Sequence, residues 1–258
     1  MLKTKLSDKV SAFVVRVLQN RLMLLGILLG IQSLFFVTNG LNSILRDPDD
    51  GWELKIEFVD QHLTPQPLWL IPYAIGFFAS AVVPLWAAHR MPIRIYRQFI
   101  FSMMFAAVVS YVIYMTLPTY VVKPDPDTVP GDHILATMMR TAYEVDNGIS
   151  THNAAPSQHV FYALIIMCFM IRFRPRMRVF WVWVTLGALI SASALLTRQH
   201  HSPDLIAGYL MTLVAYPAGL WLGNQVTERL HDEHSGKVAP TRHLIARRRT
   251  VNAEADPA

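Results

Sequence analysis

Long apolar runs separated by short polar segments make up most of this 258-residue chain. Six runs approach the roughly 20 residues that a helix needs to cross the hydrocarbon core of a bilayer. They cover about residues 22–39, 67–88, 99–118, 157–172, 179–196 and 204–223. Because the bilayer core offers no water to backbone N–H and C=O groups, each run is expected to be helical. The pattern predicts an all-α polytopic membrane protein with six transmembrane helices.

The basic residues predict how these spans are oriented. All but five of the 23 Lys and Arg residues lie in the N-terminal segment, in the second and fourth loops, or in the C-terminal tail. Segments rich in Lys and Arg stay in the cytoplasm, so both termini are predicted to be cytoplasmic. The chain then divides into a cytoplasmic amphipathic segment at 1–21, a transmembrane catalytic domain at 22–225, and a basic, disordered cytoplasmic tail at 226–258. The segment 1–21 equally fits a helical extension of the first span.

Composition agrees with a membrane protein and limits its partners. Charged residues make up 16% of the chain, against about 25% in soluble domains. The net charge of +5 does not indicate nucleic acid as a partner, since the basic residues flank apolar runs. With one cysteine, Cys168, no disulfide can form within the chain.

Polar residues gather in the outer loops and at the outer ends of the spans. The loop at 119–156 is long and rich in Pro, Asp and Asn, with a short helix expected near 133–144. Three polar clusters then adjoin the membrane on this side, and the predicted orientation brings them to one face. They are Lys123-Pro124, the Pro-Ser-Gln-His sequence at 156–159, and the Thr-Arg-Gln-His-His-Ser-Pro-Asp sequence at 197–204.

The second and third clusters contain residue types that suit phosphate chemistry. Ser157 stands at a predicted helix start, where free N–H groups and the helix dipole favour an anion, and His159 in the first turn can exchange a proton. His200 and Asp204 are four residues apart, so on a helix the carboxylate would orient the imidazole as a nucleophile. His201 lies three residues before Asp204, so it is an alternative partner for this carboxylate. Pro203 disfavours a continuous helix from His200 to Asp204. Taken singly, each cluster also fits an ordinary capped helix or polar turn.

Read together, these sequences resemble a known family. Pro-Ser-x-His followed about forty residues later by His-x-x-x-Asp, in a six-span chain, resembles the type 2 phosphatidic acid phosphatase superfamily. The flanking residues at 153–159, 197–200 and 204–208 are similar to its branch of inositol phosphotransferase-like and related bacterial lipid phosphatases. The resemblance covers about residues 115–210.

The resemblance implies a role for each matching residue. His200 would attack phosphorus and form a phosphohistidine, Asp204 would orient it, and His159 would protonate the leaving alkoxide. Ser157 and nearby amides would hold phosphate oxygens, and no metal or other cofactor is needed. The implied substrate is a phospholipid or isoprenoid phosphate. The implied location is the plasma membrane, in a bacterium the inner membrane, with the site facing outside.

The expected phosphate clamp departs from the family pattern. Lys123 stands where the family has Lys and then Arg-Pro, and Ala194 occupies the place of an arginine six residues before the nucleophile. Arg198 is the substitute for that arginine, Gln158 replaces a smaller residue, and Arg140 is a reserve member of the clamp.

Other readings of the same residues remain open. The lipid phosphate can be a monoester or a pyrophosphate. The phosphohistidine can be resolved by water, in a phosphatase, or by a lipid alcohol, in a phosphotransferase. His200, His201 and Asp204 can instead be read as metal ligands, although a zinc site wants three or four converging ligands. A transporter is a further alternative, because charged groups within spans mark conduits.

Overall fold

The computed structural model describes residues 13–47, 50–149 and 151–234, and within them the chain is built from helices. Residues 13–19 are helical and lead into the first long helix. The elements are α2 (Arg21–Leu45), α3 (Glu57–Asp60), η1 (Pro67–Trp69), α4 (Leu70–Arg90), α5 (Ile93–Thr116), η2 (Pro126–Thr128), α6 (Ile134–Ile149), α7 (Gln158–Phe173), α8 (Met177–Leu196) and α9 (Ser202–His234). The described residues include two isolated β-bridges but form no β-strand. The prediction of an all-α fold is confirmed.

The long helices are those of a membrane protein. Among the described residues, five helices are long and apolar enough to cross a bilayer: α2, η1 with α4, α5, α8 and α9. α7 is also apolar but has 16 residues. It packs against α4, α5, α8 and α9, and most of its side chains are buried. The fourth predicted span, at 157–172, corresponds to this central helix.

Glycine lets two helices approach closely inside the bundle. A Cβ atom added at Gly219 of α9 would lie 2.5 Å from the Cα of Ser102 on α5. A Cβ atom at Gly223, one turn later, would lie 2.6 Å from the Cα of Gln98. Small residues at such positions allow close helix packing where the hydrophobic effect between helices is weak.

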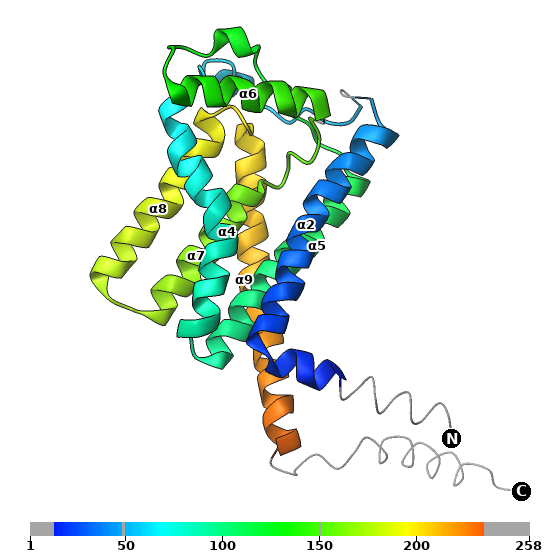
Figure 1. The fold of residues 1–258 in the computed structure, drawn as a ribbon, viewed down its shortest axis with the longest axis vertical. Coiled ribbons are helices and arrows are strands. Elements are labelled where there is room, and N and C mark those ends of the chain that lie inside the picture. The colour runs from blue at the N-terminus through cyan, green and yellow to red at the C-terminus, as the bar shows by residue number, and fades with distance from the viewer. Residues whose placement is uncertain (1–12, 48–49, 150, 235–258) are drawn as a thin grey trace, which may run out of the picture.

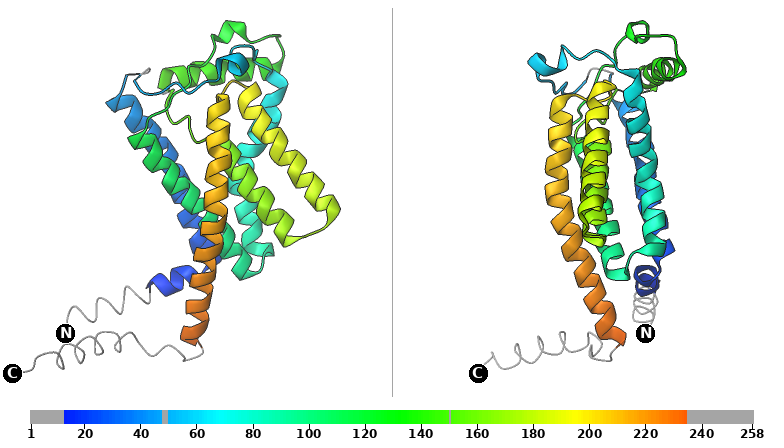
Figure 2. Two further views of the ribbon diagram at one scale, coloured as in Figure 1. Left: turned by 180° about the vertical axis from the view of Figure 1, so that it is seen from behind. Right: turned by 90° about the vertical axis from the view of Figure 1, so that its left-hand side faces the viewer.

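The two ends of the bundle differ in structure. Residues 13–19 and the end of α9 lie at one end, and α6 lies across the other (Figure 1, Figure 2). The turn between α8 and α9 and the start of α7 are also at the α6 end. This arrangement groups the three polar clusters on one side of the bundle. Of the predicted terminal segments, residues 1–12 and 235–258 lie outside the described residues, and the tail is helical as far as His234.

Candidate functional site

The turn between α8 and α9 presents His200 to Asp204. α8 ends at Leu196 with Thr197 as its C-cap. Arg198 then adopts the left-handed conformation, at φ 53°, as is common one residue past the cap. The backbone N–H of His200 then donates to the carbonyl of Ala194 at 3.0 Å. His200 Nδ1 lies 3.5 Å from Asp204 Oδ2, and the Asp204 side chain is 1% exposed. The carboxylate therefore faces Nδ1 and leaves Nε2 as the nitrogen available for chemistry.

The pair forms although His200 is not on a helix. α9 begins at Ser202, so Pro203 stands in its first turn, where the missing N–H of proline costs no hydrogen bond. Asp204 Oδ2 also accepts a hydrogen bond from the backbone N–H of His201 at 2.9 Å. The contact between His200 and Asp204 is therefore made across the capped start of α9, and not along a continuous helix.

His159 reaches the same place from the first turn of α7. Its ring stacks on Tyr73 of α4, with centroids 3.9 Å apart and planes 22° apart. The rings of His159 and His200 have centroids 6.2 Å apart. Stacking restricts the orientation of His159, so its imidazole is held beside the proposed nucleophile.

Backbone contacts hold the starts of α7 and α9 together. The N–H of Ser157 donates to the carbonyl of Asp204 at 3.1 Å. A Cβ atom at Gly208 would lie 2.9 Å from Cβ of Val160 and 3.1 Å from the carbonyl oxygen of Ser157. Glycine at this position therefore permits the close approach that brings the two histidine clusters together.

The loop before α7 is fixed by buried hydrogen bonds. Tyr114 of α5 donates to the carbonyl of Pro156 at 2.6 Å, and Thr119 accepts from the N–H of Ala155 at 2.7 Å. The side chain of Asn153 accepts from Asn42 of α2 at 2.8 Å. Buried polar groups that are paired in this way make a loop rigid, and this loop positions Ser157 and His159.

A polar cavity of about 300 Å³ joins several of the predicted site residues. Its lining includes Lys123, Gln158, His159, Gln199 and His200. Lys123 Nζ donates to the carbonyl of Gln199 at 2.8 Å. Burial of its ammonium group lowers the pKa of Lys123 to about 8, although the Asp146 and Asp204 carboxylates oppose that shift. Lys123 is thus a cation placed beside both histidines.

Several buried polar atoms next to this cavity have no hydrogen-bond partner among the described residues. On lining residues they are Gln158 Nε2, His159 Nε2 and His200 Nδ1, which approaches Asp204 without a hydrogen bond, and on adjoining residues they are Ser157 Oγ and Asp204 Oδ1. Most buried polar groups in proteins are paired, so a cluster of unpaired ones suits a site for a polar ligand. Ser157 does not line the cavity, and its side chain makes no capping bond to α7.

The three other predicted site residues point to different partners. Arg198 donates to the carbonyl of Asp60, and Arg140 donates to the carbonyls of Val129 and Gly131. The ring of His201 faces Glu53, with Nε2 and Oε1 3.3 Å apart. These three residues do not line the cavity. In the described part of the chain, no group of three or more His, Cys, Asp or Glu residues is arranged to hold a metal ion.

Sequence reasoning did not single out Asp60, Tyr73 and Asp146. Asp60 is 1% exposed and caps α9, accepting from Ser202 N–H at 3.0 Å and Ser202 Oγ at 2.8 Å. Tyr73 and Asp146 line the cavity. Asp60 lies in a visibly acidic outer loop, but the sequence offers no signal for its partner 142 residues away. Tyr73 looks like any aromatic residue at a membrane interface.

Fold and site together define an all-α protein of membrane type, with two histidines and a lysine around a polar cavity and an aspartate beside one of the histidines. The chain belongs to the PAP2 superfamily, whose family model matches residues 51–218. The match includes Lys123 and both histidine clusters, and membership implies phosphatase-type activity. No curated protein and no solved structure matches the chain significantly.

The lysine gives a pH dependence that can be measured. Below pH 8 Lys123 is a cation and can hold a phosphate oxygen, whereas above its pKa of about 8 it is neutral. We expect kcat/KM to fall as pH rises through this value, because kcat/KM reports ionisations of the free enzyme. Lys123→Met should lower kcat/KM at pH 7 by about 10- to 100-fold, as expected for a lost charged hydrogen bond, and should remove this alkaline fall. A Lys123→Met profile that keeps the fall near pH 8 would assign it to another group.

Proposed function

We propose that this protein is an integral membrane phosphatase that hydrolyses a lipid phosphate at the extracytoplasmic face, through a phosphohistidine on His200. The observation that supports this proposal most directly is the convergence of His200, backed by Asp204, with His159 and Lys123 at one cavity. A nucleophile, a proton donor and a cation are the groups that phosphoryl transfer requires. PAP2 membership supports the same class of reaction.

The first step transfers the phosphoryl group to the enzyme. His200 Nε2 attacks phosphorus while the bond between phosphorus and the ester oxygen breaks. Asp204, 3.5 Å from Nδ1, stabilises the positive charge that develops on the ring. Protonated His159 donates its proton to the leaving alkoxide, which departs as an alcohol. Lys123 balances the negative charge on the remaining phosphate oxygens.

The second step releases phosphate. His159, now neutral, takes a proton from water as the water oxygen attacks phosphorus. The bond between phosphorus and Nε2 breaks, inorganic phosphate leaves, and His159 is protonated again. If a lipid alcohol replaces water in this step, the same intermediate gives a phosphotransferase.

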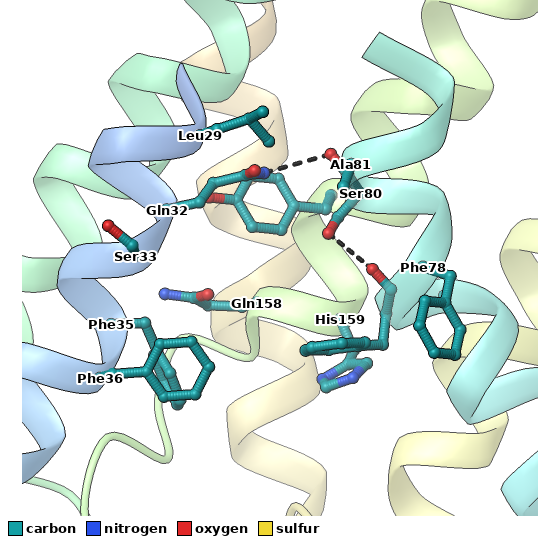
Figure 3. Close-up of a pocket in the computed structure, with 13 residues that line it drawn as sticks. Leu29, Gln32, Ser33, Phe35, Phe36, Phe78, Ser80, Ala81, Gln158 and His159 are labelled. Atoms are coloured by element: carbon teal, nitrogen blue, oxygen red, sulfur yellow. Dashed lines mark hydrogen bonds between the residues drawn. The ribbon is translucent and has the colours of Figure 1, made fainter. Parts of the chain in front are cut away.

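A groove between α2 and α4 supports a lipid as the substrate. It has a volume of about 250 Å³ and shares Phe35, Phe77, Gln158 and His159 with the polar cavity. Figure 3 shows Phe35 and Phe36 of α2 on one side of the groove and Phe78 and Ala81 of α4 on the other, with Gln158 and His159 between them. An acyl chain in this groove would place its phosphate beside His159.

A substitution inside the groove tests the place of the acyl chain. Ala81→Trp should raise KM for dioleoyl phosphatidic acid by about tenfold, because the indole fills space that several methylene groups would occupy. Hydrolysis of water-soluble p-nitrophenyl phosphate should change by less than twofold. Leu213→Trp is the matched control, since Leu213 is 70% exposed on α9 and lines none of the cavities described here. Equal effects of Ala81→Trp on both substrates would contradict this placement.

The reaction and its sidedness can be tested in one assay. Sealed right-side-out membrane vesicles containing the protein should release phosphate from short-chain phosphatidic acid added outside. The extracytoplasmic placement rests on the distribution of Lys and Arg in the loops. Free phosphate without an added alcohol supports a phosphatase, whereas product that appears only with a lipid alcohol indicates the phosphotransferase. Hydrolysis seen only after the vesicles are opened would reverse the proposed orientation.

A further inference from the structure

α6 is held over the polar cavity by hydrogen bonds to two other segments of the chain. It lies across the end of the bundle (Figure 1). Tyr143, which is fully buried, donates to the carbonyl of Thr197 at 2.7 Å. Thr197 begins the turn that carries His200. Arg140 donates to the carbonyls of Val129 and Gly131, at 2.9 and 2.6 Å, and so ties α6 to the preceding loop.

This attachment turns one face of α6 toward the site. Ala142 and Asp146 are four residues apart, on the same face of the helix, and both line the cavity. Asp146 is partly buried, and it shares this cavity with Lys123, His159 and His200. A carboxylate is an unexpected group in a cavity built for phosphate, because like charges repel strongly where water is partly excluded.

The lining of the cavity offers a phosphate one lysine as a cationic partner. Apart from histidines, Lys123 and Asp146 are the described lining residues with a formal charge at neutral pH. The two other cations considered for a phosphate clamp, Arg140 and Arg198, donate to backbone carbonyls and do not line the cavity. A second phosphate would add negative charge without adding a partner, and it would share the cavity with the Asp146 carboxylate.

We propose that Asp146 is a specificity-determining residue that restricts this site to lipids with a single phosphate and rejects lipid diphosphates. The inference rests on the proposed phosphatase function and narrows its substrate class. Repulsion between a carboxylate and a phosphate a few ångströms away changes affinity by tenfold or more in a partly desolvated site. Asp146 thereby acts on the choice of substrate, whereas His200 and His159 act on the reaction.

Two lipids with identical tails test this inference. Dioleoyl phosphatidic acid and dioleoylglycerol diphosphate are compared in mixed micelles by their kcat/KM for phosphate release. The wild-type protein should prefer the monophosphate by at least about tenfold. Asp146→Asn should reduce this preference by about tenfold, mainly by improving hydrolysis of the diphosphate. Asp146→Glu should keep the preference, because it keeps the charge.

Glu144 provides the matched control on the same helix. It is exposed and does not line the cavity, so Glu144→Gln removes an equal charge without changing the site and should keep the wild-type preference. A wild-type protein that prefers the diphosphate, or an Asp146→Asn preference within twofold of wild type, would overturn the inference. Release of phosphate from neither lipid would instead overturn the proposed function, and the inference with it.

A binding measurement on the wild-type protein covers the case in which Asp146→Asn does not fold. Inorganic phosphate and pyrophosphate are compared as competitive inhibitors of p-nitrophenyl phosphate hydrolysis. Phosphate should inhibit with the lower inhibition constant. Tighter inhibition by pyrophosphate would contradict a cavity that accepts one phosphate.

Discussion

Replacement of His200 by alanine is expected to reduce phosphate release by at least about four orders of magnitude, because covalent catalysis has no substitute for a missing nucleophile. The structure places the imidazole 3.5 Å from the Asp204 carboxylate and on the wall of the polar cavity. The two neighbouring histidines are arranged differently, since His159 stacks on Tyr73 and His201 faces Glu53. The measurement is the initial rate of phosphate release by purified protein in micelles.

The neighbouring histidine supplies the control for this experiment. His201 contributes its backbone N–H to Asp204, and this bond survives substitution of the side chain. His201→Ala should therefore lose less than about tenfold in kcat, as for other residues outside the reacting centre. Wild-type protein incubated with ³²P-labelled substrate and quenched in alkaline detergent should retain label that is stable in alkali and lost in acid, and His200→Ala should not. Near-native activity of His200→Ala would refute the phosphohistidine mechanism.

The parts of the site that sequence could predict are local. His200 and Asp204 are four residues apart, so their contact depends on one turn and one helix start. Ser157 and His159 likewise belong to one helix start, whose position follows from the polar-to-apolar boundary. The helical class of the fold was predictable for a similar reason, because long apolar runs leave a backbone few alternatives in a bilayer.

The parts that sequence did not predict depend on distant partners. Arg198 was expected at the phosphate, but its guanidinium bonds to Asp60, 138 residues earlier in the chain. The acceptor is the backbone carbonyl of Asp60, and a contact of this kind between residues so far apart in the chain leaves no signal in the sequence. The sequence did not indicate Asp146 for another reason. A helix near 133–144 was expected, but the face that it turns toward the cavity depends on the hydrogen bond between Tyr143 and Thr197. Hydrogen bonds between distant residues, and not local helix propensity, thus decide which charged side chains line the cavity.

Replacement of His159 by alanine should lower kcat for a lipid phosphate by about 100- to 10,000-fold, the range of general acid–base catalysis. The expected cause is the loss of a proton donor beside the nucleophile, whose ring centroid is 6.2 Å from that of His159. An alkoxide is a poor leaving group and needs this proton, whereas p-nitrophenolate leaves without one. His159→Ala should therefore form the phosphoenzyme from p-nitrophenyl phosphate at a rate much closer to that of wild type.

The same variant should then accumulate that intermediate, because in the proposed mechanism His159 is also the base that activates water in the second step. A stopped-flow trace would show a burst of p-nitrophenol equal to the amount of enzyme, followed by slow turnover. Wild-type protein should show a smaller burst, since its second step retains the base. Equal loss of rate on both substrates without a burst would mean that His159 only shapes the cavity through its stacking on Tyr73. The two substrates thus separate a proton-transfer role from a packing role at one residue.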